Sequence, residues 1–276
     1  MEVEETYVFP KVTLVWVSEL LLDEICKYVI SKIEELGRKP VTTDLCVGLR
    51  YTYAVVEVSG EKFIGLCYTP LEDISHSNQE VTSPSDLASD TVCDLIKSTN
   101  YVTKALAVAY LNALTSAILE IPPESSGKDL LDVMEFSSGD VVAFVGYIGP
   151  LVRRVKEVVK EVYVLERNVL RRQDALPDTA APRVLPKANK VIVTGASIVN
   201  DTIDYILSLC RRAGEVAIVG ATASLHPEPL FSAGIKYVAG FRVRRECIGD
   251  AARCIRLAGG TRELYRYGSK YVLVRS

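Results

Sequence analysis

The sequence lacks most of the short patterns that identify a catalytic or metal site. It contains no GxSxG, HExxH or GxxxxGK[ST] run and no CxxC pair. This excludes the usual signatures of serine hydrolases, zinc peptidases, P-loop proteins and thiolate metal sites. Only two histidines are present in the chain.

Long apolar runs and a strong charge imbalance are also missing. No stretch of about 18 apolar residues occurs, and the acidic start does not resemble the basic region of a secretory signal. We therefore expect a cytoplasmic protein that does not enter a membrane. The net charge of -3 gives no indication of nucleic-acid binding. Two local basic clusters are interpreted as solvated faces: Arg153, Arg154 and Lys156, and Arg242, Arg244 and Arg245.

The seven cysteines are odd in number and follow no framework spacing, which is typical of buried thiols in a reducing compartment. Cys46 and Cys67 fall on two runs that could pair as a hairpin, so a bridge between them stays open. The chain has only two methionines and two glutamines. This composition leans toward a thermophile, where intracellular disulfides are less rare.

The first part of the chain alternates helical and strand patterns. Apolar residues recur at helical spacing over residues 17–36, and Gly37 ends that helix. Two β-rich runs at 45–58 and 62–68 flank the turn at 59–61 and predict an antiparallel hairpin.

Two helices and a linker complete this part. Ser83-Pro84 indicates a helix start, and we expect one helix over 83–97 and an alanine-rich one over 102–119. The run at 121–127, with two prolines, two serines and a glycine, is the best linker candidate. We therefore assign 1–122 to a smaller α+β domain, 123–138 to a linker and 139–276 to a second domain.

The second domain repeats the order strand, turn, helix, strand. Its strands are continuous apolar runs, which favours a mostly parallel sheet covered on both faces. Right-handed crossovers make such a sheet doubly wound and Rossmann-like. Strands are expected at 141–145, 162–165, 190–193, 216–219, 237–239 and 271–274, and helices at 150–160, 201–212 and 248–258.

Three of these strands end in glycine, and each is followed by a helix start. The carboxyl ends of parallel strands share one edge of the sheet, where ligands bind. Glycine allows the backbone to approach a ligand, and helix N–H groups favour an anion. The candidate ligand-binding residues at these ends are Gly146, Gly149 and Pro150, Thr194 and Gly195, and Gly220 and Thr222.

The first of these turns is not a dinucleotide fingerprint, because Ile148 stands where GxGxxG needs its second glycine. Glu166 partly restores that interpretation, since it follows the second strand twenty residues after Gly146. It could accept hydrogen bonds from a ribose, or it could be a loop carboxylate paired with Arg167 or Arg171.

The run from Thr194 to Thr202 is the most informative one. Asn200 is well placed as a helix N-cap, with Asp201 complementing the helix dipole. The same hydroxyl, amide and carboxylate groups beside a strand-end glycine could also hold a polar ligand.

His226-Pro227, in the third run, has two interpretations as well. A histidine before a proline at a helix start is often a capping or surface group. It could instead act as a general acid or base, or as a metal ligand.

These three strand-end runs, in this order, resemble the heavy-metal chelation family. The resemblance implies a small domain like the amino-terminal part of enolase, a Rossmann-like domain, and a site between the two. In that context Asn112, a lone amide on an apolar helix, fits an interdomain site or a satisfied core position. The matching pieces are Val145-Gly146-Tyr147 with Pro150, Glu166-Arg167-Asn168, Val193-Thr194-Gly195 through Asn200-Asp201-Thr202, Gly220 through Pro227, Phe231, Gly234 and Gly240, and more loosely Asp44 to Gly48 and Ala109 to Ala113.

Three functions remain open on this basis. The leading one is a protein, with or without catalytic activity, that binds a small anionic or metal-chelating ligand in an interdomain cleft. The second is a transferase that uses a nucleoside cofactor such as S-adenosylmethionine. The third is a structural or regulatory module without a ligand. A metal ion or a nucleoside is therefore the expected cofactor class, and a homodimer is an assembly that the sequence allows.

Overall fold

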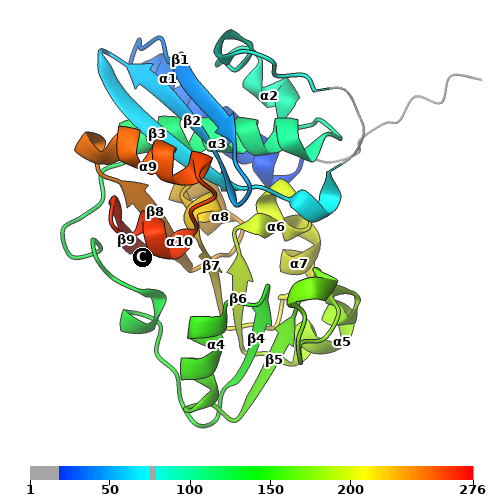
Figure 1. Cartoon of the computed structure of the whole chain (residues 1–276). Helices are drawn as coiled ribbons and strands as arrows, with labels where there is room; N and C mark the ends of the chain where they lie inside the picture. The colour runs from blue at the N-terminus through cyan, green and yellow to red at the C-terminus, as the bar shows by residue number, and fades with distance from the viewer. Residues whose placement is uncertain (1–18, 75–78, 276) are drawn as a thin grey trace, which may run out of the picture.

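The computed structural model describes residues 19–74 and 79–275 of the chain. Within these residues, three strands form an antiparallel sheet and six strands form a larger, mostly parallel sheet. Figure 1 shows the two sheets one above the other, each with its own helices. The predicted fold class is confirmed: a smaller α+β domain precedes a Rossmann-like α/β domain.

The small domain consists of the elements before the connecting segment 119–140. Its strand order is β1-β2-β3, with β2 in the middle. Its elements are α1 (Leu21–Glu35), β1 (Val41–Val47), β2 (Tyr51–Val58), β3 (Glu61–Tyr68), α2 (Val92–Leu95) and α3 (Tyr101–Ile118).

Two predictions for this domain are corrected. The run at 45–58 is two strands, because the chain turns between β1 and β2. The helix expected over 83–97 is reduced to a 3-10 turn, Pro84–Asp86, and the short α2. The Asp86 carboxylate accepts the N–H groups of Thr82 and Ser83, both at 2.8 Å, and this local turn competes with a continuous helix. The first two residues of the helix expected at 17–36 lie outside the described residues.

Helix α3 is the central element of the small domain. Every residue from Thr103 to Thr115 is buried, because the helix packs on β2 and β3 and also contacts α1, α2 and α6. The Asn100 side chain caps it by accepting the N–H of Val102 at 2.9 Å. Strand β3 comes closest at Gly65, where a Cβ would lie 2.0 Å from the Ala109 carbonyl oxygen.

The large domain begins at β4. Its strand order is β5-β4-β6-β7-β8-β9, and only β9 runs antiparallel to its neighbour. Strand β5 lies on one side of β4 and β6 on the other, so the order reverses between β4 and β6. The strands are β4 (Val141–Val145), β5 (Glu161–Leu165), β6 (Lys190–Thr194), β7 (Glu215–Val219), β8 (Tyr237–Val243) and β9 (Gly268–Val274).

The helices of the large domain are shorter than predicted. The helix expected at 150–160 ends at residue 156, and the one expected at 201–212 covers only 203–209 and is preceded by a separate turn of helix. The helices are α4 (Gly149–Lys156), α5 (Ala181–Val184), α6 (Ala196–Val199), α7 (Ile203–Leu209), α8 (Pro227–Ser232), α9 (Ile248–Arg256) and α10 (Thr261–Leu264). None of the helices in the described part of the chain has the length and apolar character that a membrane span requires.

The two domains share their apolar cores. One face of the large sheet packs on α4 and the connecting segment, and the other packs on α5 to α8 and continues into the core around α1 and α3. The outer face of the small sheet, at Tyr53, Val55, Ile64 and Leu66, is covered by α9 and α10. The C-terminal part of the chain therefore reaches back over the N-terminal sheet (Figure 1).

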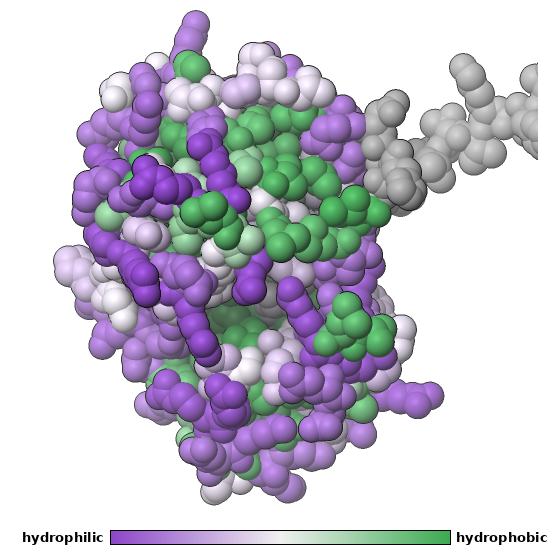
Figure 2. Space-filling model, viewed as in Figure 1, coloured by the Kyte–Doolittle hydropathy of each residue, from purple (hydrophilic) through white to green (hydrophobic). Residues whose placement is uncertain are grey.

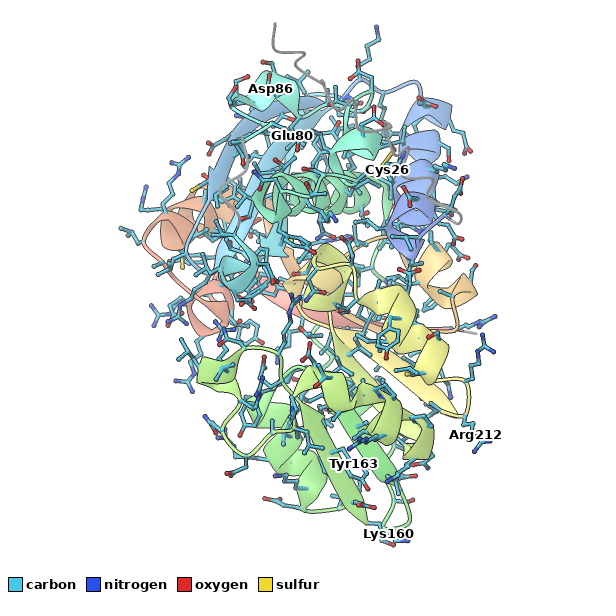
Figure 3. The ribbon with its side chains drawn as sticks, turned by 90° about the vertical axis from the view of Figure 1, so that its right-hand side faces the viewer. Cys26, Glu80, Asp86, Lys160, Tyr163 and Arg212 are labelled. Atoms are coloured by element: carbon cyan, nitrogen blue, oxygen red, sulfur yellow. A yellow bond between two sulfur atoms is a disulfide. The ribbon has the colours of Figure 1, made fainter. Side chains whose placement is uncertain are left out.

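The carboxyl ends of the parallel strands point toward the small domain. Lys160, directly before β5, lies at the end of the molecule farthest from the small domain (Figure 3). The Asn112 amide of α3, in contrast, reaches the segment that directly follows β7. The predicted ligand-binding edge of the sheet is thus the edge that meets the small domain.

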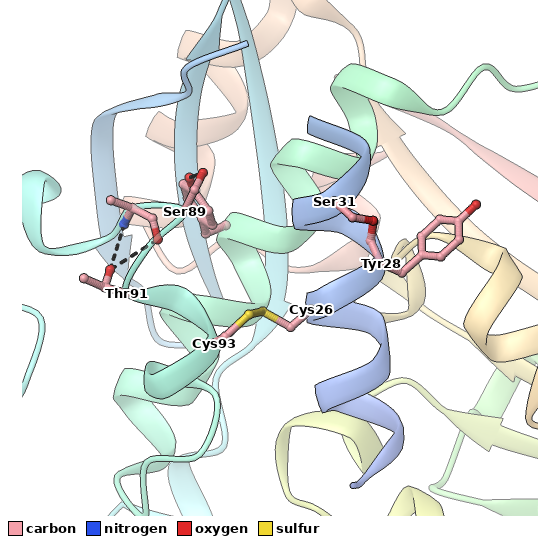
Figure 4. The surroundings of a disulfide bond; sticks show 8 residues. Cys26, Tyr28, Ser31, Ser89, Thr91 and Cys93 are labelled. Carbon is pink, nitrogen blue, oxygen red and sulfur yellow. Dashed lines mark hydrogen bonds between the residues drawn. A yellow bond between two sulfur atoms is a disulfide. The ribbon is translucent and has the colours of Figure 1, made fainter. Parts of the chain in front are cut away.

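One disulfide is present among the described residues, and it joins Cys26 on α1 to Cys93 on α2 (Figure 4). The bridge that the sequence left open, between Cys46 and Cys67, does not form. Cys46 lies on β1 and Cys67 on β3, with β2 between them. Treating residues 45–58 as one strand had placed these two cysteines on neighbouring strands.

Glu215, at the amino end of β7, is the centre of a charge cluster at the edge opposite the small domain. It accepts hydrogen bonds from Lys190 and Tyr237, each at 2.8 Å, and from Lys236. Burial raises the pKa of Glu215, but these hydrogen bonds outweigh it and lower the pKa to about 2. The native state therefore favours the ionised carboxylate.

We expect Glu215→Gln to cost about 2 kcal/mol of unfolding free energy near neutral pH. A carboxylate with a lowered pKa stabilises the fold above its unfolded value of 4.5, and this contribution disappears as the pH falls toward 2. Urea unfolding of both proteins at several pH values measures the difference, which should shrink in acid. A difference that is independent of pH would contradict this role.

Candidate functional site

Three predicted residues meet at the reversal of strand order between β4 and β6. Gly146 has a φ of +94°, and a Cβ there would lie 2.7 Å from the Thr194 side chain. The Glu166 carboxylate accepts the N–H of Tyr147 at 2.9 Å and that of Asn168 at 2.8 Å. Glu166 therefore holds the turn that follows β4, and its contact with a ribose stays a prediction.

The two arginines considered as partners of Glu166 bind elsewhere. Arg167 pairs with Asp73 of the small domain at 2.6 Å, and the Arg171 guanidinium lies 5.6 Å from the centre of the Tyr68 ring. The loop after β5 is thus attached to the small domain next to β3.

Gly195, Thr222 and Asn112 come together at the junction of the domains. A Cβ on Gly195 would lie 2.6 Å from the Ala223 nitrogen, so this glycine permits close packing of two strand ends. The Thr222 hydroxyl accepts the N–H of Tyr68 at 2.8 Å. Asn112 donates to the carbonyls of Leu66 at 2.7 Å and Thr222 at 3.2 Å. These residues fix the 3-10 turn Ala221–Ala223 against the small domain.

The predicted helix N-cap at Asn200 is wrong. Asn200 ends α6, and its amide lies 2.7 Å from the Thr202 hydroxyl and beside the carbonyls of Ala196 and Ser197. The N-cap position of α7 falls to Thr202, without a side-chain cap. The sequence placed one long helix here, whereas the chain makes two short ones.

Asp201 joins the domains through a buried lysine. Its φ of +58° turns its carboxylate toward Lys104 on α3, with which it forms an ion pair. Burial raises the pKa of Asp201, and the hydrogen bond from Lys104 opposes that effect. Asp201 therefore serves as an interdomain contact.

His226 occupies a capping position. Its Nδ1 accepts the N–H of Glu228 at 3.4 Å, at the start of α8, and its ring centre lies 4.6 Å from that of Tyr28 on α1. Burial and the charge of Lys32 lower the pKa of His226 to about 4. The neighbouring Pro227 is buried in the first turn of α8. Both residues belong to the packing of α8 on α1.

A cavity of about 310 Å³ lies where the two domains and the connecting segment meet. Figure 2 shows the molecule hollowed between α10 and α4, with apolar side chains at depth and hydrophilic ones at the rim. Two predicted residues line it: Pro150, directly after Gly149 at the start of α4, and Gly220, whose φ is +117°. A Cβ on Gly220 would meet no atom within 4 Å, so its exposed backbone faces open space.

The cavity wall carries more positive than negative charge. Lys128 of the connecting segment, Arg154 of α4 and Arg262 of α10 line it, and in the described part of the chain no carboxylate lies within 4 Å of these three cations. Lys270 of β9 also lines it and pairs with Asp129 at 2.6 Å. Aromatic side chains complete the wall: Tyr51, Phe241, Tyr265 and Tyr271.

The connecting segment is held in place as one side of this cavity. The Gly127 N–H donates to the Lys270 carbonyl at 2.8 Å, and the Val272 N–H donates to the Ser125 carbonyl at 3.1 Å. Leu130 is buried against α4 and the large sheet. The predicted linker thus forms part of the cavity wall.

The cationic wall was only partly visible in the sequence. Arg154, in the cluster interpreted as a solvated face, is exposed and also lines the cavity. In the other basic cluster, Arg242 is largely buried and donates to the Leu119 carbonyl at 2.7 Å, which caps the end of α3. Lys128, Arg262 and Lys270 come from segments without a recognisable motif. A signal for Arg154 was its position one helical turn beyond Pro150.

The described residues do not form a metal-binding cluster. Nowhere in residues 19–74 and 79–275 do three His, Cys, Asp or Glu side chains lie close enough together to hold a metal ion. The residues of the cavity wall supply cations and hydrogen-bond donors, which suit a negatively charged molecule. They do not fit a resident metal ion.

The chain is similar over most of its length to proteins without a known function. An uncharacterised protein of Methanocaldococcus jannaschii is 28% identical over 231 residues, which are 82% of this chain and 88% of that protein. A crystal structure of a DUF364 family protein of unknown function from Pyrococcus horikoshii has a TM-score of 0.82 and 27% identity, and covers 93% of this chain and 100% of that one.

A second solved structure shows the same fold at lower identity. This DUF364 family protein of unknown function from Desulfitobacterium hafniense has a TM-score of 0.69 and 21% identity, and covers 91% of this chain and 98% of that one. Two family models match the chain, DUF4213 over residues 30–115 and DUF364 over residues 129–274, and both are described as "Putative heavy-metal chelation". Because the DUF364 match spans more than half of the chain, the protein belongs to this family.

Proposed function

We propose that the protein binds a small organic anion, of the kind that chelates metals, in the cavity between its two domains. The observation that carries this proposal is the excess of cations around this interdomain cavity. A volume of about 310 Å³ falls in the range of small-molecule sites.

The location of the cavity supports the proposal. It borders the carboxyl end of β7, where α/β proteins bind ligands, and the middle of β8, and the start of α4 offers N–H groups that favour an anion. The exposed backbone at Gly220 allows a ligand to approach a strand end closely.

The family description is compatible with such a ligand. Because the described residues do not form a cluster of metal-ligating side chains, a metal would enter as part of a chelate, held by the donor atoms of the ligand. The cationic wall would then recognise the outward-facing carboxylates or other acidic groups of that chelate.

Replacing two wall cations tests this function. We expect Arg154→Gln with Arg262→Gln to lower the affinity for citrate or nickel citrate about tenfold or more, because each lost charge-assisted contact weakens binding. Isothermal titration calorimetry measures the affinity, with nickel alone as a further ligand that should not bind in the cavity.

A matched control comes from the same helix. Arg153 is exposed on α4 and does not line the cavity, so Arg153→Gln should bind citrate as the unmodified protein does. If the unmodified protein binds neither citrate nor its nickel chelate, the proposed function is wrong. Equal losses in the control and in the double variant would show general charge attraction without a site.

A further inference from the structure

Lys270 differs from the other cations of the cavity wall because it already has a counter-ion there. Its Nζ pairs with the Asp129 carboxylate at 2.6 Å, whereas Lys128, Arg154 and Arg262 have no carboxylate within 4 Å among the described residues. The wall therefore holds three uncompensated cations and one internal ion pair.

The pair lies partly in solvent. The side chains of Lys270 and Asp129 are 37% and 28% exposed, and an ion pair at such exposure contributes little net stability. Burial lowers the pKa of Lys270, but the hydrogen bond to Asp129 and the interaction with Tyr265 together outweigh it, so the pKa is raised. Lys270 stays charged with its ammonium above the Tyr265 ring, 4.7 Å from the ring centre.

The backbone around Asp129 does not depend on this pair. The Asp129 N–H donates to the Asp132 carboxylate at 2.7 Å, and the Gly127 N–H is bonded to the Lys270 carbonyl. The Asp129 side chain can therefore rotate away from Lys270 while the connecting segment keeps its place.

We propose that Asp129 is a displaceable counter-ion: an anionic ligand takes its place on Lys270 when it enters the cavity. This inference rests on the proposed function. It makes Asp129 a specificity-determining residue, because a ligand must compete with a carboxylate already bound to Lys270. Ligands with several acidic groups compete well, since they also contact the uncompensated cations, whereas a monoanion such as acetate does not.

The test is the affinity of Asp129→Asn for citrate, measured by calorimetry. Asparagine has the same shape as aspartate and is equally favourable at the N-cap position that Asp129 occupies. Because no carboxylate then competes with citrate for Lys270, we expect citrate to bind roughly threefold to fivefold more tightly. Glu124→Gln removes an exposed acid of the same segment outside the cavity wall and serves as the matched control.

A second variant, at Lys270, tests whether the effect of Asp129 on citrate binding depends on its pairing with Lys270. Lys270→Met should weaken citrate binding, and adding Asp129→Asn to it should recover part of the loss, because an unpaired Asp129 would repel the ligand. Unchanged or weaker binding by Asp129→Asn, with an unaltered melting temperature, overturns the inference while citrate binding by the unmodified protein upholds the proposed function. No binding of citrate by any of these proteins overturns both.

Discussion

Gly65→Ala should lower the free energy of unfolding by at least about 3 kcal/mol, a large effect for the addition of one methyl group. The added Cβ would lie 2.0 Å from the Ala109 carbonyl oxygen and 2.2 Å from the Ala113 nitrogen. Both are backbone atoms of α3, which is itself buried on all sides, so neither the strand nor the helix can move away cheaply.

Urea unfolding followed by circular dichroism measures this loss. The matched control is Gly249→Ala on α9, where an added Cβ meets no atom within 4 Å. Alanine is preferred over glycine in a helix, so the control should be as stable as the unmodified protein or gain up to about 1 kcal/mol. Equal small effects at the two positions would show that α3 and β3 are not in close contact.

Loss of the Cys26–Cys93 disulfide should have an effect of similar size. The bridge closes a loop of 67 residues that contains all three strands of the small sheet. Constraining the unfolded chain over such a loop stabilises the native state by about 4 kcal/mol. We therefore expect the free energy of unfolding to fall by about 4 kcal/mol in the double variant Cys26→Ala, Cys93→Ala. The same loss is expected for the unmodified protein refolded under reducing conditions.

The double variant also provides the control for the reductant. Its stability should not change when a thiol reductant is added, since its remaining cysteines are free thiols. Guanidinium unfolding of both proteins with and without reductant gives the four values needed. If reduction leaves the unmodified protein as stable as before, the bridge does not stabilise the fold.

The large domain was predictable because its strands are continuous apolar runs. Strand β4 was predicted at its observed bounds and β6 to within one residue. Strand β1 was missed as a separate element, because its residues are half-exposed and interrupted by polar side chains, which weakens the β pattern. The disulfide could not be predicted, since the contact between α1 and α2 arises only from their packing in the folded chain.

The sequence indicated the sheet edge that borders the cavity, but it did not indicate the residues of the cavity wall. The strand-end glycines correctly indicated the edge of the sheet that meets the small domain. Sequence alone could not separate Gly195, where the missing side chain admits another strand end, from Gly220, which faces open space. The cations of the wall come from three distant segments of the chain. These segments meet because β9 pairs with β8 and the connecting segment lies alongside β9.

The way in which α9 and α10 cover the small sheet has a consequence for synthesis on the ribosome. Tyr53 and Ile64 are made early, yet the residues that bury their outer face, such as Ile255 and Leu264, are among the last to be translated. One apolar face of the nascent N-terminal sheet therefore stays exposed until the C-terminal helices have been translated. Chains with such an exposed apolar face are prone to aggregate. A nascent chain halted before residue 248 should thus be bound by chaperones that recognise exposed apolar surface.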